Sequence, residues 1–311
     1  MSDARRPALF AQLPPAACQG YRNLRHPPSS NAALCRDYCE HLWSRFYPYA
    51  DDGFAEDFAV HLHQRFWEMY LGATLLDAGH QITAPKPGPD FRLRLGDRTV
   101  WIEAVAATPG EPGRPDSVPR YEPKEGVIEG HYVPHDQIVL RCTAAIAAKF
   151  PAQYNRHVQM GLIGRADCYV VAVNHAEAYH WAEVGIPPYM LRAVLGLGSP
   201  FVTIDRTSGE LAGSGIEYRG RISKANGSAV ATSLFLSEDS SPVSAVLGSV
   251  TTIGTPVHIQ DAEHHLGQDF RLVRNPVCRN RLPEGLLRRG EEVTVTLREN
   301  EFSVSGRLLD P

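Results

Sequence analysis

Residues 88–105 read GPDFRLRLGDRTVWIEAV, and this stretch decides the fold. Apolar and charged residues alternate from Asp90 to Leu95, which is the period of a half-buried strand. Gly96-Asp97 is a two-residue turn signal of the kind that joins antiparallel strands. The apolar run 100–106 then forms the returning strand. The sequence therefore predicts a β-hairpin whose outer ends lie side by side.

The two outer ends of this hairpin carry acidic residues. Asp90 begins the first strand, and Glu103 interrupts the apolar run of the second. A buried carboxylate is costly unless it is paired or bound to a metal ion. Two adjacent carboxylates also repel each other and favour a cation between them. Because both offer hard oxygen ligands, the pair is suited to Mg²⁺ or Mn²⁺.

The segments around the hairpin supply further elements. Residues 54–79 have apolar side chains at helical spacing, with Glu68 in the apolar second half and Gly79 as the stop. Residues 80–84 read as a short strand. Downstream, residues 136–149 read as a helix that Asp136 can cap, and 168–174 as a buried strand. Residues 31–46, with Asn31 as a cap, and 188–197 read as further helices.

This order of elements resembles the PD-(D/E)xK superfamily, the restriction-endonuclease-like fold of metal-dependent nucleases. The resemblance covers residues 54–174. Pro89-Asp90 match the Pro-Asp motif, Glu103 matches the second acidic position, and Glu68 matches the helical Glu of one branch. The fold class implied is α/β, with a restriction-endonuclease-like core (a mixed sheet flanked by helices) and a β-rich C-terminal region.

The motif lysine is where the chain departs from the superfamily. The pattern places Lys two residues after the Glu, and that position is Val105. Some members carry the lysine on the following helix instead. The four lysines here are at positions 86, 124, 149 and 224. Lys149, on the helix after the core strands, is the best candidate, although Pro151 follows it and proline ends or kinks a helix.

The resemblance implies a function as well as a fold. Asp90 and Glu103 would hold Mg²⁺ (or Mn²⁺), with Glu68 as a third ligand or a group that orients water. Lys149 would stabilise charge on the phosphoryl oxygens. The implied enzyme is a Mg²⁺-dependent endo- or exonuclease, a phosphodiester hydrolase that acts on DNA in preference to RNA.

Each residue also has a plainer interpretation. Asp90 after Gly-Pro is a common turn residue. Glu103 could form a structural ion pair with an arginine such as Arg141. Glu68 and Lys149 could be solvated helix residues. Two rival functions follow: a non-catalytic nucleic-acid-binding or assembly module on the same fold, and an unrelated α/β enzyme or ligand-binding protein in which Glu103 is merely ion-paired.

Composition sets wider limits. The 311 residues are 43% hydrophobic, enough for a substantial core, and the net charge of −4 provides no global attraction for nucleic acid. The 27 arginines and four lysines still allow local phosphate-binding clusters. No apolar run is long enough for a bilayer, and the N-terminus lacks a secretory h-region. We therefore expect a cytoplasmic protein with no membrane partner, and free rather than disulfide-bonded cysteines.

Stretches rich in Pro and Gly indicate boundaries that divide the chain into three parts. Residues 1–50 form an N-terminal arm and helix, 51–175 the restriction-endonuclease-like core, and 176–311 the β-rich C-terminal region. The core contains the Pro- and Gly-rich insertion 107–134, which leaves directly from the Glu103 strand. A long irregular loop at that place indicates either a lid over the site or a disordered insertion.

Overall fold

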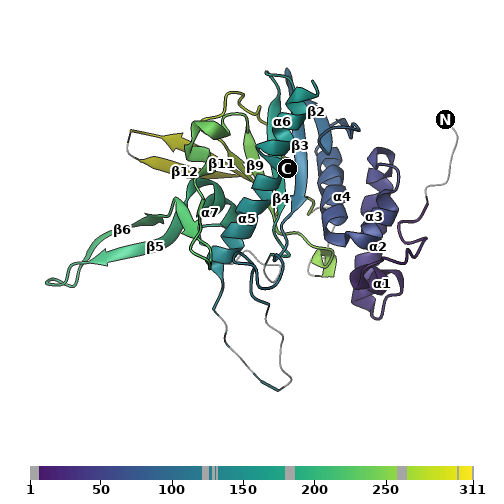
Figure 1. Cartoon of the computed structure of the whole chain (residues 1–311), viewed down its shortest axis with the longest axis horizontal. Coiled ribbons are helices and arrows are strands. Elements are labelled where there is room, and N and C mark those ends of the chain that lie inside the picture. Colours follow the sequence, from purple (N-terminus) through teal and green to yellow (C-terminus); the bar gives the residue numbers. More distant parts are fainter. Residues whose placement is uncertain are drawn as a thin grey trace.

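The computed structural model describes residues 7–120, 126–127, 130, 132–178, 186–257, 265–299 and 301–309. These residues form one eight-stranded mixed sheet with helices on both faces (Figure 1). The strand order is β1-β2-β3-β4-β9-β10-β11-β12. The predicted mixed α/β class, with a large sheet flanked by helices, is therefore confirmed.

The first face of the sheet is covered by N-terminal helices (Figure 1). They are α1 (Gln19–Arg25), α2 (Ser30–Phe46), the 3₁₀ turn η1 (Tyr47–Tyr49), α3 (Phe54–Val60) and α4 (Leu62–Asp77). The predicted single helix over 54–79 is wrong, because the chain breaks at His61 (φ −111°, ψ 52°). The cap of α2 is Ser29, whose hydroxyl accepts from the Ala32 N–H, rather than Asn31.

Helix α4 packs closely because its sequence permits it. All but one of the side chains from Phe66 to Leu75 are apolar or small, and all of them are buried. Gly72 lies against the ring of Phe46, where an added Cβ would be 2.6 Å from two ring carbons. A larger residue at this point would therefore push α2 and α4 apart.

The first four strands follow the predicted order of helix, three strands, helix and strand. They are β1 (Ile82–Thr83), β2 (Phe91–Leu95), β3 (Arg98–Ala106) and β4 (Cys168–Asn174). Strand β1 has only two residues of the predicted 80–84. The pairs β1–β2 and β2–β3 are antiparallel, and β3–β4 is parallel. Between β3 and β4 lie α5 (His135–Lys149) and α6 (Ala152–Gln159).

Two expectations about this middle region need correction. Asp136 is not the cap of α5; it lies in the first turn, and its two oxygens accept from Arg219. The described beginning of the 107–134 insertion is bonded to the rest of the protein, because Arg141 donates to Thr108 O and to Asp116. The predicted lid also involves residues 121–125, 128–129 and 131, which lie outside the described residues.

The C-terminal part extends the same sheet. Its main strands are β9 (Ala245–Ser249), β10 (Arg271–Arg274), β11 (Gly290–Leu297) and β12 (Phe302–Leu309). Strand β9 runs parallel to β4, so the sheet continues across residue 175. The remaining elements are α7 (Tyr189–Leu195), the hairpins β5 (Leu197–Ile204)–β6 (Leu211–Tyr218) and β7 (Arg221–Ser223)–β8 (Ala229–Ala231), and the 3₁₀ turns η2 (Leu234–Leu236), η3 (Glu238–Ser240) and η4 (Thr255–Val257).

Strand β4 separates the two halves of the core. All seven of its residues are buried, as a parallel strand covered on both faces requires. Cys168, Val170 and Ala172 face the N-terminal helices. Tyr169, Val171 and Val173 face α5 and α7. Because side chains alternate along β3 as well, Glu103 lies on the same face as Trp101, toward α5 and α6.

Candidate active site

The β2–β3 hairpin sets Asp90 beside Glu103. Leu95 pairs with Arg98 across a two-residue turn in which Gly96 has φ +59°, a conformation that suits glycine. The last pair at the open end is Phe91 with Ile102, so Asp90, one residue earlier, lies opposite Glu103. Asp90 Oδ2 accepts a hydrogen bond of 2.7 Å from the Ala104 N–H. This bond fixes the Asp90 carboxyl against the backbone of β3.

A glutamine continues the bonding of β3 where β2 stops. Gln64, on α4, donates from Nε2 to Ala104 O (3.2 Å) and accepts from the Ala106 N–H at Oε1 (2.7 Å). The pairing of β2 with β3 ends at Ile102. Beyond that point, Asp90 and Gln64 bond the backbone groups of Ala104 and Ala106 that no described strand on this side of β3 bonds. Gln64 thereby ties α4 to the strand that carries Glu103.

Glu103 is 1% exposed and is surrounded by three donors. Lys149 Nζ donates to Oε2 (2.9 Å), and Gln153 Nε2 (3.0 Å) and His157 Nε2 (2.9 Å) both reach Oε1. Lys149 is the last residue of α5, and the other two belong to α6. The chain turns at Phe150-Pro151, so two successive helices present polar side chains to one carboxylate. Tyr169 donates to Lys149 O (3.1 Å) and holds that helix end in place.

The alternative interpretation, in which Glu103 forms an ion pair with Arg141, is wrong. Arg141 pairs with Asp116 (3.1 Å), whereas the cation on Glu103 is Lys149. Two other lysines pair elsewhere, Lys86 with Asp51 and Lys224 with Asp116. Lys124 lies outside the described residues. Lys149, the last residue of α5, therefore places its ammonium group beside Glu103.

Glu68 approaches from the opposite layer. It is 5% exposed, and its Oε2 accepts from Arg65 Nη1 at 2.8 Å. Arg65 also contacts Asp57 (2.5 Å) and Asp51 (3.7 Å), so it is shared among three carboxylates. The structure thus brings Asp90, Glu103 and Lys149 together in one cluster, with Glu68 beside it in an arginine-linked group on α4.

The two glutamates hold protons unusually well. Burial, and then the charge of Asp90, raise the pKa of Glu68 to about 7 despite Arg65. Burial, the Asp90 charge and a hydrogen bond with Asp90 raise the pKa of Glu103 to about 7, against the opposing effect of Lys149. Because the charge of Asp90 raises the pKa of both Glu68 and Glu103, the three carboxyl groups are electrostatically coupled and repel one another.

The pKa values of the two basic side chains beside Glu103, Lys149 and His157, are shifted in opposite directions. Burial lowers the pKa of Lys149, but Asp90, Glu103 and Glu68 together outweigh burial and raise it, so Lys149 remains an ammonium ion. Burial, with Arg156 and Lys149, lowers the pKa of His157. A neutral His157 can donate from Nε2 to Glu103, and its buried Nδ1 has no hydrogen-bond partner among the described residues. The cluster therefore combines an ammonium group whose charged form is favoured with an imidazole whose charged form is disfavoured.

Gln64, Gln153 and His157 did not emerge from the sequence patterns. A spacing signal for them does exist. Gln64 lies four residues before Glu68, on the same helical face. Lys149, Gln153 and His157 are also four residues apart, and only Pro151 between them suggested that the face would not continue.

The cluster offers only a few carboxylate ligands to a cation. Among the described residues, no group of three or more His, Cys, Asp or Glu side chains is arranged to hold a metal ion. Asp90 and Glu103 form a two-carboxylate set with spare lone pairs. Such a set is within the range for Mg²⁺, which binds through one or two carboxylates and keeps several waters. The donor chemistry therefore fits a hard divalent cation with an incomplete protein shell.

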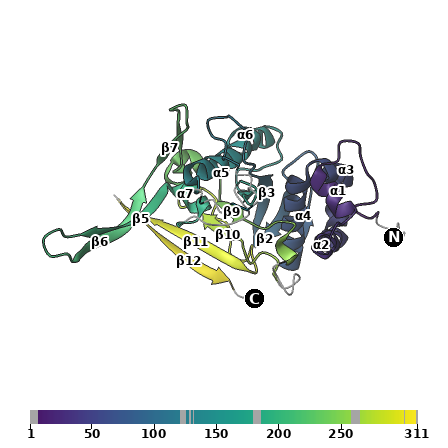
Figure 2. The ribbon, with the colours of Figure 1, turned by 90° about the horizontal axis from the view of Figure 1, so that it is seen from below.

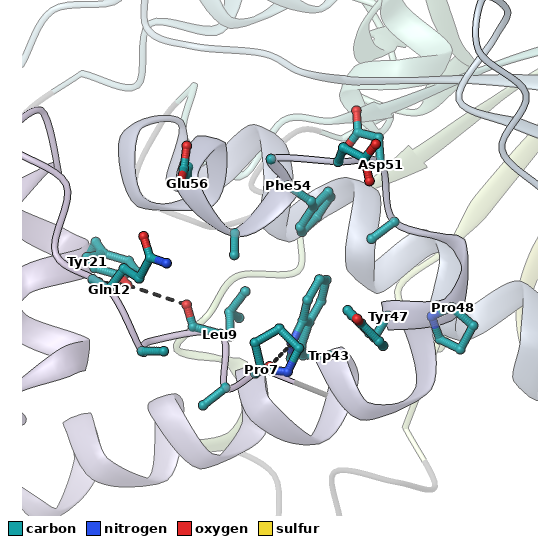
Figure 3. A pocket seen from close by; sticks show the side chains of 16 residues that line it. Pro7, Leu9, Gln12, Tyr21, Trp43, Tyr47, Pro48, Asp51, Phe54 and Glu56 are labelled. Carbon is teal, nitrogen blue, oxygen red and sulfur yellow. Dashed lines mark hydrogen bonds between the residues drawn. The ribbon is translucent and has the colours of Figure 1, made fainter. Parts of the chain in front are cut away.

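A separate cavity of about 430 Å³ lies between the N-terminal segment, α2 and α3 (Figure 3). Trp43 donates to Pro7 O at its floor, and Tyr21 donates to Gln12 O at one side. Its lining includes Asp51 but not Asp90, Glu103 or Lys149. This cavity is therefore distinct from the carboxylate cluster.

The chain matches no protein-family model, no curated protein sequence and no solved structure. Within the described residues, every helix is too short or too polar to cross a bilayer.

Proposed function

We propose that this protein is a divalent-metal-dependent nuclease that hydrolyses phosphodiester bonds, in DNA in preference to RNA. The observation that carries the proposal is the convergence of Asp90, Glu103 and Lys149. Lys149 Nζ lies 2.9 Å from Glu103 Oε2, and the Asp90 charge acts on both partners. Two carboxylates can hold a metal ion that activates water, and an ammonium ion beside them can stabilise charge on a phosphoryl group, so the cluster suits metal-assisted phosphodiester hydrolysis.

The order of elements supports the same proposal. Helix α4, strands β1–β3, helix α5 and strand β4 follow one another with the pairings antiparallel, antiparallel and parallel. This order is in keeping with the resemblance to the PD-(D/E)xK superfamily, although the fold alone does not establish a function. Lys149 would take the role of the lysine that Val105 lacks.

Asp90 and Glu103 would hold the Mg²⁺ or Mn²⁺ ion. When bound, the ion would lower the pKa of a water molecule and neutralise charge on the scissile phosphate. It would also relieve the repulsion that raises the pKa of Glu103. Glu68 would serve as a further ligand or as a group that orients water.

The chain's own residues then have separate tasks. Lys149 carries a permanent positive charge to the phosphoryl oxygens. Gln153 and His157 donate to Glu103 Oε1 and hold its carboxyl group in one orientation. Glu68, with a pKa of about 7, can exchange a proton near neutral pH, as a group that assists deprotonation of water must do.

The proposal is tested by offering the purified chain supercoiled plasmid, linear duplex, single-stranded DNA and RNA. Cleavage should appear when Mg²⁺ or Mn²⁺ is supplied and disappear with EDTA. Glu103→Ala should lose the activity while remaining folded, because the charge of Asp90 still balances that of Lys149. If no substrate is cleaved with either metal, the proposal fails.

The second candidate is a non-catalytic nucleic-acid-binding or assembly module on the same fold. One observation favours it: both oxygens of Glu103 already accept hydrogen bonds from protein donors. In that case the cluster would be a structural ion pair. Retention of DNA without metal and without cleavage would support this second function.

A further inference from the structure

The β5–β6 hairpin projects from the rest of the protein. Figures 1 and 2 both show it extending away from the sheet and the helices, with its tip free. Eight-residue strands span about 26 Å, so much of the hairpin lies beyond the body. Residues 199–212 are all exposed. A two-stranded hairpin without a covering layer is marginally stable in water.

One face of this hairpin is apolar. Pro200 pairs with Ile216, Val202 with Ser214, and Ile204 with Leu211. The side chains of Val202, Ile204 and Leu211 are 64%, 58% and 67% exposed. The charged residues of the tip are Asp205, Arg206 and Glu210, which give no positive surface for nucleic acid.

An apolar groove lies at the base of the same hairpin. It has a volume of about 960 Å³ between the base of β5–β6 and the β11–β12 pair. Its apolar walls include Leu197, Ile216 and Tyr218 from the hairpin, and Leu297, Phe302 and Val304 from the sheet. The charged residues Glu217, Arg298, Glu299 and Glu301 also line it. Tyr218 and Phe302 meet edge to face, with ring centroids 6.5 Å apart. The chain thus carries both an apolar projection and an apolar groove.

We infer that the hairpin is a dimerisation arm, and that its occupant is a second copy of this chain. In the dimer, the arm of each copy lies in the groove of the other. Val202, Ile204 and Leu211 fill the apolar groove of the partner. A two-fold axis places the projecting hairpin of each chain in the groove of the other, so the same contact forms twice and the dimer is closed.

The exposed area suits this occupant. At roughly 100 Å² per side chain, the five large apolar residues exposed on this face of the hairpin present on the order of 500 Å². These are Val202, Ile204, Leu211, Ile216 and Tyr218, whereas Phe201 lies on the opposite face. The area is within the range of the largest patch on a monomer and, with the groove walls that the sheet contributes (Leu297, Phe302 and Val304), approaches the roughly 800 Å² per partner of a stable interface.

Sedimentation equilibrium from about 1 to about 100 μM tests the inference. The wild type should have twice the 34.3 kDa mass of one chain at the upper concentrations. The double variant Val202→Ser/Ile204→Ser should remain at the mass of one chain throughout. Leu34→Ser, at an exposed leucine on α2, is the matched control and should dimerise like the wild type.

Amide hydrogen exchange of the wild type gives a second readout that needs no variant. Residues 197–218 should exchange more slowly at the higher concentration. A wild type that stays monomeric over the whole range overturns the inference, and so does a hairpin variant that still dimerises. A monomer that binds phosphatidylcholine vesicles through this hairpin overturns it as well, and assigns the apolar face to a lipid surface.

Discussion

The raised pKa of Glu103 predicts an unusual dependence of stability on pH. An ordinary glutamate has a pKa of 4.5, and Glu103 has one of about 7 in the folded protein. The unfolded chain therefore releases this proton first as the pH rises. Glu103 in the folded protein keeps its proton up to about pH 7, so the free energy of unfolding falls between pH 4.5 and 7. Above pH 7 both states have lost the proton, and the free energy of unfolding does not fall further on account of Glu103.

The magnitude follows from the shift. Each pKa unit corresponds to about 1.4 kcal/mol, so the free energy of unfolding should fall by about 3 kcal/mol on account of Glu103 alone. Glu103→Gln replaces the carboxyl group by a neutral amide of similar size. The variant should match the wild type near about pH 4.5 and should be more stable by about 3 kcal/mol near about pH 8.

Urea unfolding followed by tryptophan fluorescence at several pH values measures this difference. Glu56→Gln, at an exposed position of α3, is the control and should keep the pH profile of the wild type. If the wild type and Glu103→Gln have parallel profiles from about pH 5 to about pH 8, the account of Glu103 as a strained buried carboxyl is refuted.

Three further predictions follow from the same geometry. Mg²⁺ or Mn²⁺ should raise the melting temperature of the wild type near about pH 8 but not that of Asp90→Asn, since the ion binds only the folded carboxylate pair; equal shifts would show that the ion binds elsewhere. Lys149→Ala should slow metal-dependent cleavage by about 100-fold or more with little change in metal affinity measured by calorimetry, whereas Lys224→Ala should cleave at the wild-type rate. Gly72→Ala should lower the free energy of unfolding by about 1–3 kcal/mol in urea, because its methyl group would meet the Phe46 ring; an unchanged value would mean that α2 yields freely.

The parts of the fold that local signals specify could be predicted from the sequence. Alternation and the Gly96-Asp97 turn give the β2–β3 hairpin, and with it the position of Asp90 opposite Glu103. An uninterrupted apolar run gives β4 with its observed bounds. Periodicity does not locate the break at His61, because apolar spacing continues through it while the backbone leaves the helical region.

The partners of Glu103 could be predicted only in part. Lys149 was identified because few lysines are available, whereas Arg141, the alternative partner of Glu103, pairs with Asp116 instead. Such choices depend on how α5 rotates against β3, which is set by tertiary packing. Gln153 and His157 lie beyond Pro151, where helical periodicity is expected to fail, so their approach to Glu103 became visible only in three dimensions.

The rate of metal-dependent DNA cleavage by wild type and by Asp90→Asn, purified in parallel, tests the central claim most directly. Asp90 affects the protonation of Glu68, Glu103 and Lys149, so its charge is the common element of the cluster. We predict nicking of supercoiled plasmid by the wild type with Mn²⁺, and a rate at least about 100-fold lower for the folded Asp90→Asn variant. Equal rates for the two proteins, or no cleavage by the wild type, would contradict the assignment of this cluster as a nuclease site.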